Sequence, residues 1–302
     1  MTSFFPTPLT QSAYFRLLEY QKKMRLPSYQ PDYPLIFFIF FSRIASGLSI
    51  LSLFFPSSIF WAAITFGAIV LATLASILHL SVPWRFLTMV RNNKSYLVWE
   101  IRLAGALTAF LGIQFLSSFG WFPGLRAFLP GINFVLAILF LISTGWAYRF
   151  ETHPAWKTPL LPAYYVVSAL MAGLVLRSIE YESPMIPPFY AVLLVTEGFL
   201  IALYWNHLKM VSPTSLKKIV MDRERWVSLA FFWTTLLLPA LITLALLLEG
   251  NIKTLQVVLI ASCLTGIFLE RILFFWVEKP IYFLSFIENP KKDEKYPYWI
   301  RG

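Results

Sequence analysis

Long apolar stretches separated by short polar connections dominate the sequence. Eight stretches are each bounded by Pro, Gly or charge, and each has about the ~17–25 residues that a membrane-spanning helix requires. Because lipid offers the backbone no hydrogen-bonding partners, such stretches are expected to be helices. The sequence therefore predicts an all-α integral membrane protein, a bundle of eight transmembrane helices. The expected spans are Pro34–Phe54, Ser58–Leu78, Val98–Phe119, Ala127–Tyr148, Leu160–Leu176, Ile186–Trp205, Val227–Leu248 and Leu255–Trp276.

The composition leads to the same class. Of the 302 residues, 58% are hydrophobic and only 13% are charged, whereas a soluble domain carries about 25% charged residues. So few charged residues cannot provide the polar surface of a water-soluble protein. The pattern divides the chain into an N-terminal extension (1–33), the eight-helix transmembrane domain (34–276) and a C-terminal tail (277–302).

The basic residues are distributed very unevenly between the two sides of the expected bundle. The net charge of +10 reflects 25 Lys and Arg residues, of which 19 lie on the side that carries both termini. Only Arg126, Arg177 and Lys253 lie on the other side, and three more fall inside spans. Basic residues mark cytoplasmic loops, so we expect both termini to be cytoplasmic, in the cytoplasmic (inner) membrane. This distribution accounts for the basic charge, and no nucleic acid is expected as a partner.

Few residues in the chain could hold a metal. Cys263 is the single cysteine, so the chain can form neither an internal disulfide nor a cysteine-ligated cluster. The three histidines, His79, His153 and His207, lie at inner helix ends or in inner loops. A haem held within the bundle needs two facing imidazoles. We therefore expect no haem, no iron–sulfur cluster and no metal in this chain.

Ionisable residues inside the expected spans are the first candidates for function, because burying charge in lipid is costly. Arg43 lies about halfway along the first span and Glu197 about halfway along the sixth, while Glu270 and Arg271 lie in the inner part of the eighth. One interpretation is a structural ion pair between Arg43 and either Glu197 or Glu270. The other is a proton path or a ligand site.

His79 and Glu100 form a second candidate site. His79 ends the second span, and Glu100 lies near the start of the third, so both return to the same depth near the cytoplasmic boundary. An imidazole and a carboxyl can hydrogen-bond a quinone head group and exchange its protons with water. The alternative is that both residues only cap helices and anchor the interface.

Several motifs resemble the membrane-anchor subunit family of dimethyl sulfoxide reductase. The most specific one is His79-Leu80-x-x-Pro83-x-Arg85 followed by Ser95 and Glu100-Ile101. The other similar motifs, in the same order along the chain, are Phe41–Gly47, Tyr148-Arg149 with Pro154–Pro159, and Arg271–Phe275. The chain departs from the family at the eighth span, where Ile267 and Glu270 replace a Glu and a Gly, and at Arg43, where the family more often has an uncharged polar residue.

The resemblance implies a subunit that has no independent catalytic centre. Such a subunit anchors a molybdopterin catalytic subunit and a four-cluster-type iron–sulfur subunit, and it binds menaquinone or ubiquinone from the quinone pool. His79 and Glu100 would serve the quinone site, and Arg85 carries over as a motif residue. Because this site lies at the cytoplasmic boundary, the partner subunits are expected on the cytoplasmic face.

Two other functions compete with this interpretation. A small-solute transporter or channel could use Arg43 and Glu197 along a path, but transporters commonly show repeats and broken helices, and no repeat is evident here. An intramembrane acyl- or prenyltransferase would call for a buried histidine or an Asp-rich motif, which the spans lack. The quinone-binding anchor is therefore the leading hypothesis.

Overall fold

The computed structural model of the protein describes residues 33–56, 58–79, 96–149, 156–180, 186–211, 225–249 and 253–276. Within them, eight helical runs are long and apolar enough to cross a membrane, and there is no strand. The prediction of an eight-helix, all-α membrane protein is therefore confirmed. The N-terminal extension and the C-terminal tail lie outside the described residues, apart from Tyr33, and the orientation of the termini stays a prediction.

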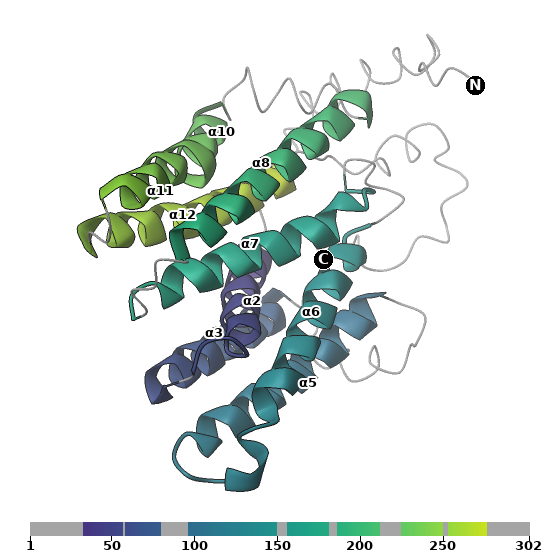
Figure 1. The fold of residues 1–302 in the computed structure, drawn as a ribbon. Helices are drawn as coiled ribbons and strands as arrows, with labels where there is room; N and C mark the ends of the chain where they lie inside the picture. The colour runs from purple at the N-terminus through teal and green to yellow at the C-terminus, as the bar shows by residue number, and fades with distance from the viewer. Residues whose placement is uncertain are drawn as a thin grey trace, which may run out of the picture.

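The helices follow the expected spans closely (Figure 1). The first four spans are α2 (Tyr33–Leu51), α3 (Ile59–His79), α5 (Tyr96–Ser117) and α6 (Leu129–Ala147), with a short 3-10 helix, η1 (Pro123–Leu125), between the last two. The last four are α7 (Leu160–Arg177), α8 (Ile186–Val211), the continuous run of α10 (Arg225–Phe232), η2 (Trp233–Leu237) and α11 (Leu238–Glu249), and α12 (Lys253–Trp276). The helix α8 continues past the expected end at Trp205, because its last turns are polar but still helical.

The seventh span contains a π-helical turn that its apolar pattern did not indicate. This turn, η2, lies between α10 and α11. The Gly266 backbone of α12 approaches it so closely that a Cβ at Gly266 would lie 2.3 Å from the Thr235 hydroxyl. A π turn is rare and is frequently found at functional sites.

Two helices form the centre of the bundle. About 72% of α2 and 67% of α7 is buried inside the protein, against 44% or less of every other span. The helix α2 contacts α3, α6, α7 and α12, and α7 also contacts α6, α8 and α12. Figure 1 shows α7 between the group formed by α2, α3, α5 and α6 and the group formed by α8, α10, α11 and α12.

The two central helices touch backbone to backbone at glycines. A Cβ added to Gly47 of α2 would lie 1.8 Å from the Ala169 carbonyl oxygen, and one added to Gly173 of α7 would lie 2.5 Å from the Gly47 carbonyl carbon. Lipid tails are as apolar as leucine, so membrane helices associate through such close packing of small residues. This contact brings Arg43 of α2 next to the phenols of α7.

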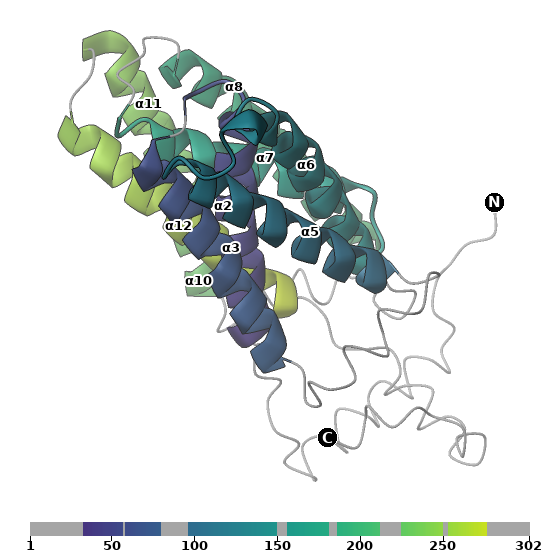
Figure 2. The same cartoon turned by 90° about the horizontal axis from the view of Figure 1, so that it is seen from below.

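Consecutive spans alternate in direction, so one end of the bundle collects several helix termini (Figure 2). The helices α3, α6, α8 and α12 end there, and α5, α7 and α10 begin there. Because α3 ends at His79, we call this the His79 end.

The glycine contact generates the first prediction. Gly47→Ala should destabilise the purified chain in detergent by about 1–3 kcal/mol, because the methyl group forces α2 and α7 apart. Gly67 of α3 is the matched control, since nothing lies within 4 Å of a Cβ added there. Gly67→Ala should be neutral or stabilising by about 0.5–1 kcal/mol. Thermal unfolding of the two variants checks this, and equal midpoints would contradict the packing described.

Candidate functional site

His79, Glu100 and Arg85 are the residues predicted for the quinone site. The structure brings the first two to the same end of the bundle. His79 is the last residue of α3, and Glu100 lies in the first turns of α5, which packs antiparallel to it. Only the backbone of His79 is described, and Arg85 lies outside the described residues.

Glu100 faces the protein interior although its neighbours face outward. Its exposed fraction is 3%, whereas Leu97 and Trp99 are 43% and 47% exposed. The Thr144 hydroxyl of α6 lies beside the Glu100 carboxyl, but the Oε1 atom of Glu100 has no hydrogen-bond partner among the described residues. A buried carboxyl oxygen without a partner is costly, and it can accept a hydrogen bond from a ligand or water.

The four ionisable residues predicted inside the spans come together in a buried ion cluster on α2, α8 and α12. They are Arg43, Glu197, Glu270 and Arg271. Arg43 of α2 donates from a terminal nitrogen to Oε2 of Glu270 on α12, at 2.9 Å. Arg271 donates from Nε to Oε2 and from its NH2 group to Oε1 of the same Glu270, both at 2.5 Å. Of the two partners considered for Arg43, Glu270 is thus the one within ion-pair distance. Both arginine side chains are fully buried.

Two adjacent tyrosines of α7 complete the surroundings of the arginines. Arg271 donates its third hydrogen bond to the Tyr165 hydroxyl at 2.6 Å. The Arg43 guanidinium lies 4.4 Å from the centre of the Tyr165 ring and 5.3 Å from that of Tyr164. Attraction to the ring faces adds about 0.5–2 kcal/mol per contact and partly replaces lost hydration. A buried ion pair offsets its desolvation cost only when it has such additional partners.

Glu197 of α8 lies at the edge of this cluster. Its side chain is 1% exposed, and it interacts electrostatically with Arg43, Glu270 and the Tyr164 hydroxyl. Neither carboxyl oxygen of Glu197 reaches strict hydrogen-bond geometry with a described group. The cluster therefore contains two arginines, two carboxyls and two phenols from α2, α7, α8 and α12.

Tyr165 belongs to the ion cluster through its hydroxyl, which accepts a hydrogen bond from Arg271. The sequence treated His79 with Glu100 and the four residues Arg43, Glu197, Glu270 and Arg271 as separate groups. The structure gathers the four around Tyr164 and Tyr165, and it places His79 and Glu100 at the same end of the bundle. The tyrosines were missed because a tyrosine in an apolar stretch is usually a packing or interface residue.

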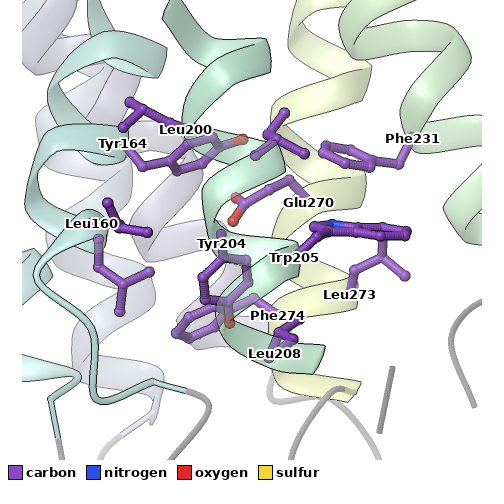
Figure 3. A pocket seen from close by; sticks show the side chains of 12 residues that line it. Leu160, Tyr164, Leu200, Tyr204, Trp205, Leu208, Phe231, Glu270, Leu273 and Phe274 are labelled. Atoms are coloured by element: carbon purple, nitrogen blue, oxygen red, sulfur yellow. The ribbon is translucent and has the colours of Figure 1, made fainter. Parts of the chain in front are cut away.

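A pocket adjoins the ion cluster and opens between α7, α8, α10 and α12 (Figure 3). Its walls enclose about 570 Å³ of space not filled by atoms, part of it open to the outside. The lining is mostly leucine and aromatic residues, with the Glu270 carboxylate among them. No sequence pattern marked this pocket, because its lining residues come from four helices.

Metal ligands do not gather in the part of the chain that the structure describes. No group of three or more His, Cys, Asp or Glu residues there could hold an ion. Cys263 is buried as a free thiol.

Comparison with known proteins assigns no family. No protein-family model matches the chain, and no curated protein matches it.

The cluster generates the second prediction. Tyr165→Phe keeps the ring but removes the hydroxyl that accepts from Arg271. Because a hydrogen bond to a charged group contributes about 1.5–3 kcal/mol, the variant should lose that much stability in detergent. Tyr164→Phe is the control, since it removes a neighbouring buried hydroxyl that accepts no hydrogen bond from either arginine. This control variant should lose clearly less stability. Equal losses in the two variants would show that the Arg271 contact adds nothing.

Proposed function

We propose that the chain is the membrane anchor and quinone-binding subunit of a molybdopterin-dependent oxidoreductase of the sulfoxide, sulfite or other sulfur-compound class. It would pass electrons between the quinone pool and a four-cluster-type iron–sulfur subunit. The observation that carries the proposal is the buried Glu100 carboxyl, whose Oε1 has no hydrogen-bond partner among the described residues, at the end of the bundle where α3 ends in His79. The family resemblance of the His79–Glu100 motif supports it further.

The proposed chemistry is a proton exchange coupled to electron transfer. A quinol that becomes a quinone loses two electrons and two protons. Glu100 would accept a proton at its Oε1 atom, and the His79 imidazole would hydrogen-bond a ring oxygen and pass protons to water at the membrane boundary. The electrons would leave to the iron–sulfur partner. The reverse reaction uses the same groups in the opposite order.

The ion cluster bears on the transporter alternative. A transporter would place Arg43 and Glu197 along a solute path, whereas Arg43 is paired with Glu270 and covered by two tyrosine rings. An arginine held in an ion pair and packed against two rings fits a structural role better than a path for solutes. The anchor proposal requires no such path.

The orientation belongs to the same proposal. The 19-to-3 distribution of basic residues supports cytoplasmic termini. Because His79 and Glu100 share the end at which the last helix also ends, the partner subunits would dock on the cytoplasmic face, close to the quinone site.

The third prediction tests the quinone site in the assembled complex. His79→Ala removes one hydrogen bond worth about 0.5–3 kcal/mol, so affinity for a quinol analogue should fall roughly 2- to 100-fold. Glu100→Gln keeps the shape but loses the proton acceptor, so it should slow quinol turnover more than it weakens analogue binding. Activity with an artificial electron carrier should survive in both. His207→Ala, on α8 at the same end of the bundle, is the control and should keep quinol activity.

Native-lipid purification shows whether the partners are present. Co-elution of molybdenum- and iron-containing subunits is expected, and a chain that elutes alone would contradict the proposal.

In sealed inside-out vesicles, a membrane-impermeant carrier should reach those subunits; access only in right-side-out vesicles would reverse the orientation. Quinol turnover at the original rate in assembled His79→Ala and Glu100→Gln complexes would remove both residues from the site.

A further inference from the structure

The pocket between α7, α8, α10 and α12 is not part of the His79–Glu100 site. It lies in the His79 half of the bundle, between the first turns of α7, the last turns of α8 and α12, and Phe231 in the last turn of α10. Five of its twelve lining residues are leucines, and Leu200, Leu208 and Leu273 are each 9% exposed or less. The space of about 570 Å³ between these walls is continuous with the outside, so a ligand can enter it from the membrane side of the bundle.

Flat aromatic rings cover the other walls. Trp205 of α8, Phe231 of α10 and Phe274 of α12 line the pocket (Figure 3). Other rings hold two of them in place. Trp205 contacts Phe232 with ring centres 4.9 Å apart, and Phe274 stacks on Trp156 at 4.8 Å. Such walls suit a flat ring that can stack on them.

One charged group faces this apolar space. Figure 3 shows the Glu270 carboxylate directed into the pocket from α12. The two oxygens of a carboxylate offer about four acceptor positions, and the two arginines use three of them. Among the described residues Oε1 accepts only from Arg271, so it retains capacity for one more donor.

Phenol groups accompany the carboxylate. The side chains of Tyr164 and Tyr204 also line the pocket, and Tyr164 is 7% exposed. Its hydroxyl has no partner at strict hydrogen-bond geometry among the described residues. An acyl chain would offer the Tyr164 hydroxyl and the Glu270 carboxylate no polar partner, and a polar metabolite would not match the leucine and aromatic walls. The lining suits a flat, apolar ring that carries hydroxyl or carbonyl oxygens.

We propose that this pocket is a second binding site for the ring of a membrane quinone or quinol. A quinol hydroxyl would donate to Oε1 of Glu270, and the ring would lie against the aromatic walls. This inference rests on the proposed function, since it takes the quinone pool as the source of the ligand. Hydrogen bonds link the Glu270 carboxylate of this pocket through Arg271 to the Tyr165 hydroxyl.

The test uses the whole complex in native lipids and a photoreactive azidoquinone with a short isoprenoid chain. After irradiation, labelled peptides are mapped by mass spectrometry, with and without excess unlabelled quinone. Competed label on peptides of α7, α8 or α12 around the pocket is the expected result. This map of the unmodified complex answers the question even if a variant fails to assemble.

A matched pair of variants then places the ligand. Leu200→Trp fills the pocket and should lower its labelling at least fivefold. Leu194→Trp is the control, because Leu194 lies on the same helix with nearly the same burial, 8% against 9% exposed, and does not line the pocket. It should leave the label unchanged. Equal labelling of the pocket in both variants would overturn the inference.

The outcomes separate this inference from the proposed function. Competed label confined to peptides of α3 and α5 would overturn the second site and leave the quinone-binding anchor intact. The absence of competed label anywhere would overturn both. Label at the pocket alone would support the second site and remove His79 and Glu100 from quinone binding.

Discussion

The structure depends on an ion pair between two residues that lie 227 positions apart, Arg43 and Glu270. It forms at the point where the first span, the fifth and the last meet. Either charge alone in this buried place would cost several kcal/mol. Together with Arg271 and Tyr165, they form a set in which the carboxylate accepts three hydrogen bonds. The cluster therefore fixes α12 against α2 and α7, and it directs Glu270 toward the pocket.

The ion pair also explains how the chain differs from the family that its motifs resemble. Arg43 and Glu270 are both departures from that family's pattern, and they contact each other. Without Arg43, Glu270 would still accept from Arg271, whereas Arg43 without Glu270 would keep, among the described residues, only the two tyrosine rings beside it. Glu270 also lines the pocket, so one carboxylate takes part both in the ion cluster and in the ligand site proposed above. This is the physical reason for treating the pocket and the cluster as one region.

The sequence predicted the fold well, because span length and apolar content are set by the membrane and not by the details of packing. It also placed His79 and Glu100 at one end, since that follows from alternating span direction. It left two partners open for Arg43, because a pattern along the chain does not specify how helices rotate or meet. The π turn at Trp233–Leu237, the roles of Tyr164 and Tyr165 and the pocket depend on contacts between helices, and no local signal indicates them.

A double-mutant cycle on Arg43 and Glu270 tests the central claim most directly. Arg43→Met and Glu270→Gln are measured singly and together by unfolding of the purified chain in detergent. The account predicts that each single change is strongly destabilising, by about 3–5 kcal/mol. It also predicts that the double variant loses at least about 1 kcal/mol less than the sum of the two. Losses that add to within about 0.5 kcal/mol would show that the two residues do not stabilise each other, and would contradict the account.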